Sequence, residues 1–353
     1  LHDAVVLKKS WQKVLTSRLK LMARLKLNVE NEAQDGRITI LNNKQELDVR
    51  VSVLPSSFGE AVVLRLLGIG AVDVSISELG LTGKALEVIQ TQLHKANGMI
   101  ITTGPTGSGK TTTLYSFLRE LNQPGVKIIT LEDPVEYKVE GIQQTPVDHH
   151  VDFSFVKALR AVLRQDPDVV MVGEIRDPET AETALQAALT GHIVLSTLHT
   201  NDAAGAVPRL ITMGVKPFVI APALNAIIAQ RLVRRLCTSC MEKTELDAPT
   251  LEKVNGLLSE IPKNSEVEVP KDLVFYTSKG CAQCGGLGYK GRMGIYEIIE
   301  VTDKMKELIL TEPSGLAVKK LATEQGSLTM IQDGLIKATQ KITDVHEVFR
   351  VAG

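Results

Sequence analysis

The chain has 353 residues, a length typical of about two domains. Its hydrophobic content of 44% is sufficient for a buried core. The net charge of −1, from 40 basic and 41 acidic residues, gives no sign of a nucleic-acid or membrane surface. Aromatic residues make up only 4%, so few side chains could stack on single-stranded bases. We therefore expect no nucleic acid among its partners.

The sequence also shows no pattern typical of a membrane span or of a secretion signal. The longest apolar run, from Phe218 to Ala229, is interrupted by Pro222 and Asn225 and falls short of the roughly 20 residues that span a bilayer. We interpret it as a buried helix. The sequence has no signal-peptide pattern, and its four cysteines form two CxxC pairs, which indicates a reducing cytosol and a metal rather than disulfides. Because the chain begins with Leu1 rather than Met, we expect the start of its first domain to be missing.

The first part of the chain predicts a small α+β domain. Apolar residues recur at helical spacing over 10–22, which predicts an amphipathic helix. Asp35-Gly36 predicts a turn. Strands are then expected over 38–41, 47–53 and 61–67, the second of them alternating apolar and polar residues.

The second part alternates strands and helices after a linker at 68–81. Strands are expected over 99–102, 127–131, 169–172 and 193–196. This alternation predicts an α/β sheet with helices on both faces. The segment 236–296 is a cysteine-flanked insert, and short amphipathic helices are expected from Val301 onward.

A phosphate-binding loop follows the first of these strands. Residues 104–111 fit the pattern G-x-x-x-x-G-K-[ST] without a mismatch, between a predicted strand and a predicted helix. Backbone N–H groups and the helix N-terminus would bind phosphate, Lys110 would reach the β and γ phosphates, and Thr111 would ligate Mg²⁺. A chance glycine-rich turn is the alternative. The predicted nucleotide-binding residues are Gly104, Pro105, Thr106, Gly107, Ser108, Gly109, Lys110, Thr111 and Thr112.

Polar residues follow the other three strands. Glu174 stands where a Walker B aspartate is usual and could hold Mg²⁺ through water. Glu132, Asp133 and Glu136 could polarise the attacking water or bind metal. His199 is placed to sense the γ phosphate. Because ligands of α/β sheets sit at the carboxyl ends of strands, we expect these residues to gather there. The alternatives are a solvated acid, an acidic turn and a structural histidine.

In this order and spacing the segments resemble the type II/IV secretion ATPase superfamily, of the GspE/PilB type. The resemblance covers nearly the whole chain. The motifs that carry it are the Walker A box at 104–111, an Asp box at 129–137, an atypical Walker B at 163–177, a His box at 190–203 and the segment 229–237 before the cysteines.

The resemblance implies an α/β fold, with a RecA-like P-loop ATPase domain and a zinc-binding insert after a small α+β PAS-like N-terminal domain. The implied divisions are 1–72 for the PAS-like domain, 73–235 for the RecA-like ATPase domain, 236–296 for the tetracysteine zinc-binding subdomain and 297–353 for the C-terminal helical part of the ATPase domain.

Roles for individual residues follow from the same resemblance. Glu136 would activate water, Glu174 would support Mg²⁺ and His199 would sense the nucleotide state, with Glu132 also in the catalytic group. Arg37 and Arg50, in segments similar to family motifs of the small domain, would cover the bound nucleotide, where guanidinium groups suit phosphate oxygens. Taken alone, these are two strand-edge arginines. Arg65 is a weaker third candidate.

The cysteines predict a structural Zn²⁺ site. Cys237 and Cys240 form one CxxC pair, and Cys281 and Cys284 form the other, so two knuckles could close a tetrahedral site. The separation between the pairs is longer than the ~15–20 residues of a compact ribbon. Four unliganded thiols are the alternative. In the family that the chain resembles, assembly motors commonly carry such a site and retraction motors generally lack it.

The resemblance thus implies a homohexameric ATPase that drives pseudopilus or type IV pilus assembly for protein secretion. Its expected cofactors are ATP, Mg²⁺ and Zn²⁺. Its expected partners are an inner-membrane platform protein and a cytoplasmic recruitment protein, and its expected location is the cytoplasmic face of the inner membrane. The alternatives are a pilus retraction motor, a RecA-like nucleic-acid translocase and a zinc-based interaction module with an inactive P-loop.

Overall fold

The computed structural model describes residues 4–42, 45–67, 74–147, 153–270 and 272–353. The chain divides into two compact units, Leu1–Asp73 with Glu136–Lys138, and Val74–Val135 with Val139–Gly353. Each unit is considered by itself. Within the described ranges, no helix is both long and apolar enough to cross a membrane.

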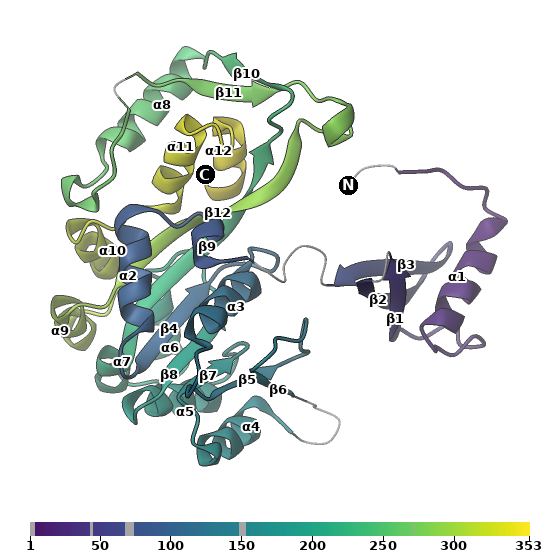
Figure 1. Cartoon of the computed structure of the whole chain (residues 1–353), viewed down its shortest axis with the longest axis horizontal. Helices are drawn as coiled ribbons and strands as arrows, with labels where there is room; N and C mark the ends of the chain where they lie inside the picture. The colour runs from purple at the N-terminus through teal and green to yellow at the C-terminus, as the bar shows by residue number, and fades with distance from the viewer. Residues whose placement is uncertain (1–3, 43–44, 68–73, 148–152, 271) are drawn as a thin grey trace. The chain divides into compact units, whose positions relative to one another are not determined.

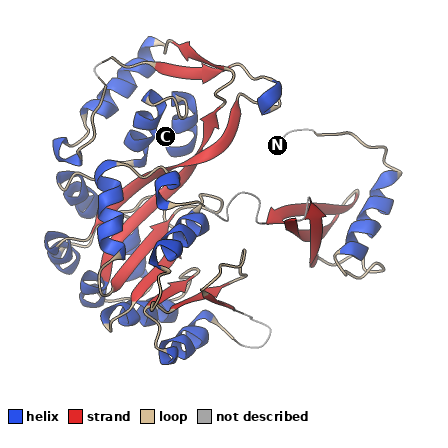
Figure 2. Cartoon of the chain, viewed as in Figure 1, coloured by secondary structure: helices blue, strands red, loops and turns tan. Residues whose placement is uncertain are grey.

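In its described residues, the first unit contains one helix and a three-stranded antiparallel sheet in the order β1-β2-β3 (Figures 1 and 2). Its elements are α1 (Trp11–Met22), β1 (Gln34–Asn42), β2 (Gln45–Ser56) and β3 (Gly59–Leu67). Val49, Val51 and Val53 alternate along β2 and are buried, as expected for a strand with one face on a core. The predicted helix and three strands are confirmed.

The turn expected at Asp35-Gly36 is wrong, because both residues lie within β1. A Cβ atom added to Gly36 would lie 2.6 Å from the carbonyl oxygen of Ala23. The absence of a side chain at Gly36 therefore lets the residues after α1 approach the strand closely. Close approach of another backbone segment is a common reason for a glycine inside a strand.

The exposed face of α1 also differs from the expected pattern. Trp11 and Val14 are 54% and 62% exposed, while Thr16 and Lys20 are buried. Lys20 forms an ion pair with Glu60 of β3, which compensates the burial of its charge. Helical spacing correctly predicted the helix, but of these apolar residues Leu19 packs against the core of the unit while Trp11 and Val14 do not mark the packed face.

The second unit is built on a seven-stranded sheet in the order β12-β9-β4-β8-β7-β5-β6 (Figure 1). From β9 to β6 neighbouring strands are parallel, and β12 pairs antiparallel with β9. The strands are β4 (Gly98–Thr103), β5 (Ile128–Glu132), β6 (Gln143–Pro146), β7 (Val169–Val172), β8 (Ile193–Leu198), β9 (Leu224–Leu236) and β12 (Tyr289–Glu300). The mixed α/β fold with a parallel sheet and its four predicted strands are confirmed.

Helices alternate with these strands and continue to the C-terminus (Figure 2). The α-helices are α2 (Gly83–Leu93), α3 (Lys110–Leu121), α4 (Phe155–Val162), α5 (Pro178–Leu189), α6 (Ala206–Thr212), α7 (Pro217–Ala223), α8 (Ala248–Ser259), α9 (Asp303–Thr311), α10 (Gly315–Glu324), α11 (Met330–Thr339) and α12 (Val345–Ala352). Short 3₁₀ turns are η1 (Ile76–Leu79), η3 (Leu163–Gln165), η4 (Lys263–Ser265) and η5 (Ala282–Cys284). The helices expected after Val301 are confirmed.

The single buried helix expected from Phe218 to Ala229 is wrong in its second half. The helix α7 ends at Ala223, and β9 begins at Leu224. This strand lies between β4 and β12, and its first seven residues are all buried. A strand buried on both faces reads as a continuous apolar run, which periodicity cannot separate from a buried helix.

The cysteine-flanked segment contains a two-stranded sheet, β10 (Met241–Thr244) with β11 (Phe275–Ser278), and the helix α8 between them. The segment returns to the large sheet through β12. The expected division after residue 296 therefore falls inside β12, and the one after residue 235 falls one residue before the end of β9. Strands of the large sheet run across both positions.

Candidate nucleotide site and cysteine cluster

The phosphate-binding loop joins β4 to α3. Gly104, Gly107 and Gly109 have φ values of 149°, 79° and 90°, which favour glycine. At Gly104 a Cβ atom would lie 2.6 Å from the backbone oxygen of Gln230, so space also requires a glycine. The helix α3 begins at Lys110, which places its N-terminal N–H groups at the loop.

Lys110 is held by its own loop. Its Nζ donates to the carbonyl oxygens of Gly104 and Pro105 at 2.8 and 3.0 Å. Burial lowers the pKa of Lys110, while the negative charge of Glu174 opposes this shift. Within the described part of the chain, the buried hydroxyl of Ser108 has no hydrogen-bond partner. A ligand with phosphate oxygens could accept bonds from both residues.

Glu174 and His199 meet at the ends of adjacent parallel strands, β7 and β8 (Figure 1). One carboxylate oxygen of Glu174 lies 3.5 Å from Nε2 of His199, and the other accepts from Arg176 at 2.6 Å. This bond raises the pKa of Arg176 further. The carboxylate is largely buried, so its orientation is fixed by these two partners.

Threonine side chains connect the end of β4 to the residues after β8. The hydroxyl groups of Thr103 and Thr200 are 2.7 Å apart, and the backbone N–H of Thr200 donates to Thr103 Oγ1 at 2.8 Å. Arg231 of β9 donates to the carbonyl oxygen of Asn201 at 2.8 Å, and burial lowers its pKa. The phosphate loop and the His-box segment are therefore joined directly.

The acidic segment after β5 contains two different environments. Glu132 is only 3% exposed and accepts hydrogen bonds from Tyr115, Thr130 and Gln144. Glu136 lies in the loop that follows and is half-buried. The two glutamates of this segment, both expected in the catalytic group, thus differ in their access to solvent.

The first unit carries its three candidate arginines in one row. Arg37 of β1 is opposite Arg50 of β2, which is opposite Arg65 of β3. Residues directly opposite in antiparallel strands share a face, so three positive charges lie side by side. All three are exposed.

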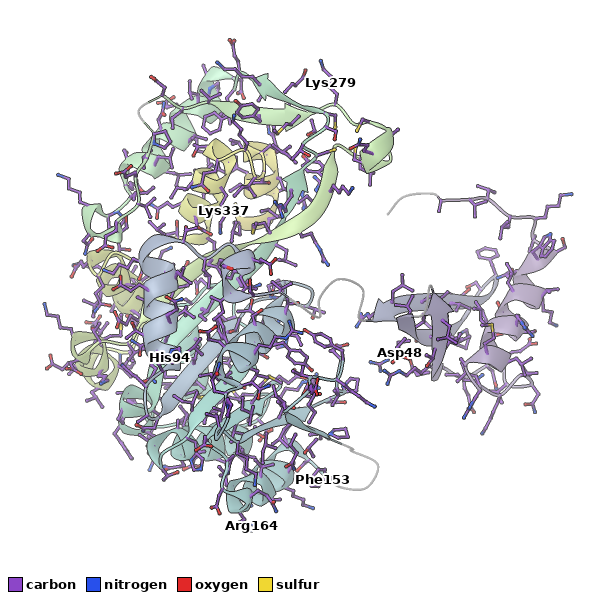
Figure 3. All side chains as sticks on the ribbon, viewed as in Figure 1. Asp48, His94, Phe153, Arg164, Lys279 and Lys337 are labelled. Atoms are coloured by element: carbon purple, nitrogen blue, oxygen red, sulfur yellow. The ribbon has the colours of Figure 1, made fainter. Side chains whose placement is uncertain are left out.

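An acidic residue borders this row. Asp48 (labelled in Figure 3) accepts from Thr39 at 2.7 Å and forms an ion pair with Arg37. The Thr39 hydrogen bond, with the Arg37 charge beside it, lowers the pKa of Asp48. Arg37 is thus neutralised in part, whereas its neighbour Arg50 has a like charge on each side.

The four cysteines converge beside the start of β12. Their Sγ atoms all lie within 4.8 Å of one another. Cys237 is 3.9 Å from Cys281, and Cys240 is 3.9 Å from Cys284. Cys281 and Cys284 are 3.8 Å apart. The predicted grouping of these side chains is therefore seen in the structure.

Backbone groups support this cluster. The N–H groups of Cys281 and Gly288 donate to Sγ of Cys284 at 3.1 and 3.2 Å. The first of these bonds contributes most to lowering the pKa of Cys284 to about 6. Gly285 and Gly286 have φ values of 59° and 80°, which gives the chain the tight turn needed behind the second pair. The arrangement favours the thiolate form of Cys284, the form that binds metal, whereas burial raises the pKa of Cys240 to about 12.

The profile of the family described as "Type II/IV secretion system protein" matches residues 1–350. The chain belongs to this family. Curated relatives include the type II secretion system ATPase E of Vibrio cholerae serotype O1, which is 44% identical over 351 residues, covering 99% of this chain and 67% of the relative. The type IV pilus assembly ATPase PilB of Myxococcus xanthus is 44% identical over 340 residues, covering 95% of this chain and 58% of the relative.

This family member spans about two thirds of the length of the curated relatives it matches. Among solved structures, that of the pilus retraction motor PilT with bound ADP is similar, with a TM-score of 0.63 and 28% identity over 97% of this chain and 83% of the other. The relatives confirm the recognition of a secretion ATPase and the enzyme class expected from the sequence.

Sequence reasoning missed several side chains at the candidate nucleotide site of this family member. Gln230 accepts from Thr113 of α3 at 2.8 Å, inside the unit. Its neighbour Arg231 and the pair Thr103 and Thr200 were also missed. The segment 229–237 was recognised as similar to the family, but only the pairing of β9 with β4 brings its polar residues to the phosphate loop.

Proposed function

We propose that this chain is the catalytic core of a hexameric ATPase that hydrolyses ATP to ADP and phosphate to drive pseudopilus or type IV pilus assembly for protein secretion. One observation carries the proposal: Glu174 and His199 meet at neighbouring strand ends, at the same edge of the sheet where the phosphate loop follows β4. Family membership supports the same conclusion.

Nucleotide binding would use the loop 104–111 and Thr112. Backbone N–H groups of the loop and of the start of α3 bind phosphate oxygens. Lys110 exchanges the carbonyl oxygens of Gly104 and Pro105 for β and γ phosphate oxygens. Because the ammonium group is already at the loop, the exchange needs only a small side-chain movement.

A magnesium ion would be held by Thr111 and Glu174. These residues fit the ion, because hard cations bind oxygen ligands and Glu174 offers a carboxylate that Arg176 and His199 orient. When bound, Mg²⁺ supplies positive charge that stabilises the phosphate oxygens.

Glu136 is proposed to accept the proton of the attacking water. A general base must reach that water, and a half-buried loop glutamate is partly open to solvent. His199, in contact with Glu174, would report the state of the nucleotide through β8. Its Nε2 can donate to Glu174 or to phosphate, and the choice would change when phosphate leaves.

Arg37 and Arg50 are proposed to bind nucleotide phosphates during turnover. A row of three like charges is unfavourable by itself, and an anionic ligand would relieve it. Guanidinium groups also match phosphate oxygens in pairs. Arg65 completes the row and is a weaker candidate for the same role.

The cysteine cluster is proposed to hold Zn²⁺ as a structural site. A tetrahedron with Zn–S bonds of about 2.3 Å has S···S edges of about 3.8 Å. Three of the observed S···S distances are 3.8 to 3.9 Å, so the four residues fit the ion. Zinc would supply a cross-link between the two CxxC turns, with all four positions occupied by protein.

The proposed assembly is a homohexamer at the cytoplasmic face of the inner membrane. Its partners would be an inner-membrane platform protein and a cytoplasmic recruitment protein. The relatives that are named as assembly or secretion ATPases support this setting. The PAS-like character of the first unit and the zinc-binding role of the insert belong to the same proposal.

Two alternatives are retained. The similar solved structure of a pilus retraction motor favours retraction as a second candidate, whereas the cysteine cluster favours assembly. A RecA-like nucleic-acid translocase is less favoured by the near-neutral charge. ATPase stimulation by DNA would support that alternative.

The test is ATPase activity as a function of protein concentration, with light scattering of the same samples. We expect activity to rise steeply with hexamer content and Glu136→Gln to lose at least about 100-fold in kcat. Glu140→Gln, an exposed carboxylate in the same segment, is the matched control. Activity that is independent of concentration and survives Glu136→Gln would contradict both the base assignment and the hexamer.

A further inference from the structure

The loop that carries Glu136 is closed at its base by one side chain. Gln144 of β6 donates from Nε2 to Glu132 Oε1 at 3.2 Å, at the end of β5. Its Oε1 accepts from the backbone N–H of Val139 at 2.8 Å. Residues 133–138 run between these two points. The amide group therefore links the residue before this segment to the residue after it.

The same carboxylate also contacts the helix of the phosphate loop. Tyr115 of α3 donates its hydroxyl to Glu132 Oε2, and Thr130 donates to Oε1 at 2.5 Å. Nε2 of Gln144 lies 3.3 Å from the Tyr115 hydroxyl. Tyr115 follows Thr111 by about one helical turn. A continuous set of hydrogen bonds within the second unit thus extends from the phosphate-loop helix to Val139, the residue that follows segment 133–138.

Burial makes this set rigid. Glu132 is 3% exposed and Tyr115 is 1% exposed. A buried carboxylate is stable only when it is well hydrogen-bonded, and bonds in a low-dielectric interior are stronger than those in water. Because the Glu132 oxygens are occupied by three side-chain donors, this carboxylate is placed to hold structure rather than to contact nucleotide.

We propose that Tyr115, Glu132 and Gln144 form a clamp that positions the loop of Glu136 for hydrolysis. They are positioning residues rather than catalytic residues. The proposal rests on the proposed function, because it takes Glu136 as the base that activates water. A base acts only within hydrogen-bond distance of that water, and a displacement of about 1 Å can lower the rate about 100-fold.

The clamp predicts a separation of kinetic parameters. ATP binding depends on the phosphate loop, where Lys110 donates to the carbonyl oxygens of Gly104 and Pro105. Loosening the clamp should therefore lower kcat and leave KM for ATP nearly unchanged. A network that only stabilised the fold would lower the melting temperature without this separation.

The experiment uses Tyr115→Phe, which removes one hydroxyl, and Gln144→Leu, which keeps a similar volume. We expect each to lower kcat about tenfold while KM stays within about twofold. Hydrogen exchange of 133–142 should become faster in both variants. The matched control is Tyr289→Phe, whose hydroxyl donates to Asp344 at 2.5 Å away from the phosphate loop and whose loss should leave kcat unchanged.

Combination with Glu136→Gln completes the test. If the clamp acts through Glu136, Tyr115→Phe should cause no further loss of kcat in the Glu136→Gln background. Full kcat in Tyr115→Phe, with Glu136→Gln inactive, would overturn the clamp and leave the base assignment intact. High activity in Glu136→Gln would instead remove the base assignment. Tyr115→Phe is nearly isosteric, so it decides the question even if Gln144→Leu does not fold.

Discussion

Two regions of the second unit treat their polar groups in opposite ways. At the phosphate edge, formed by residues 104–111 with Glu174 and His199, two polar groups of the loop can take new partners. Lys110 bonds only to carbonyl oxygens among its described partners, and the described contacts leave the buried Ser108 hydroxyl unpaired. Such groups can exchange partners when an anion arrives.

The other region, which we call the cysteine end, comprises the four cysteines and the adjoining charged network of α12. The Glu347 carboxylate is fully buried and accepts from Arg234 at 2.7 Å and from Arg350 at 2.6 Å. Arg234 also lies 3.9 Å from the ring of Tyr289, whose hydroxyl donates to Asp344 at 2.5 Å. In this network the Glu347 carboxylate and the Tyr289 hydroxyl are bonded to other protein groups. The contrast indicates that polar groups of the phosphate edge change partners during turnover, whereas those of the cysteine end keep the same partners.

Removal of metal from the cysteine end should produce the largest change. For Cys281→Ser we expect loss of bound zinc and a fall of more than about 4 kcal/mol in the local stability of 237–289, because structural zinc supplies folding free energy. Metal content and hydrogen exchange of this segment are the measurements.

The matched control for that variant lies inside the first CxxC pair. Ser239 is exposed and donates to Gln283 at 2.5 Å, so Ser239→Ala should keep the metal. If the purified wild-type chain binds no zinc and Cys281→Ser shows the same protection from hydrogen exchange, the cluster is four unliganded thiols. The contrast between the cysteine end and the phosphate edge would then no longer hold.

Lys110→Ala tests the phosphate edge, where polar groups can exchange partners. We expect the ATPase rate to fall by about 10² to 10³, or about 3 to 4 kcal/mol in activation free energy, because a preorganised donor to the phosphate is lost. The melting temperature should change little, since the bonds of Lys110 go to its own loop. Lys306→Ala, at a surface ion pair with Asp303, is the control. Retained activity together with strong destabilisation would show that Lys110 is structural.

The Glu347 network predicts a pH effect confined to the cysteine end. Hydrogen bonds from Arg350 and Arg234 outweigh burial and lower the pKa of Glu347 to about 2, from a usual value of 4.5. A depressed pKa stabilises the folded state above the unfolded pKa, and this contribution is lost as the pH falls from about 4.5 through about 2. Its full size is about 3 kcal/mol at neutral pH.

Urea unfolding of Glu347→Gln and wild type between pH 3 and 7 measures this contribution. The difference in free energy of unfolding should be largest near neutral pH and should shrink toward pH 3. Glu307→Gln, at an exposed position of α9, should show no such trend. A difference that is constant over this range would mean that the ionised form of Glu347 is not the stabilising species.

Local motifs made the phosphate edge largely predictable. The pattern of residues 104–111 specifies both the conformation of the loop and its chemistry, and it needs no tertiary information. Glu174 and His199 were also found, because each lies within three residues after a predicted strand and parallel strands end at one edge. Their contact of 3.5 Å depends on β7 and β8 being neighbours, which the order of strands along the chain does not give.

What the sequence could not supply was the direction in which a side chain points. Glu132 and Glu136 belong to one acidic segment, yet only the packing of α3 and β6 around β5 shows that Glu132 is buried. Gly36 looked like a turn signal because its neighbour Asp35 is also common in turns, whereas its role is to admit Ala23. The cysteine pairs were predictable as a set, since metal ligands of this kind recur at fixed spacing.

The arginine row of the first unit gives the smallest and sharpest test of the contrast. Arg50 lies between Arg37 and Arg65, and only Arg37 among these three has a described ion pair, with Asp48. Like charges directly opposite one another destabilise a sheet, so Arg50→Gln should raise the stability of this unit by about 0.5 kcal/mol. If the row binds phosphate, the same variant should lower ATPase activity.

A gain in stability with a loss of activity identifies a residue retained for its ligand, as at the phosphate edge. Loss of stability with unchanged activity would place Arg50 with the saturated groups of the cysteine end, and Arg65→Gln would then show whether the whole row is structural.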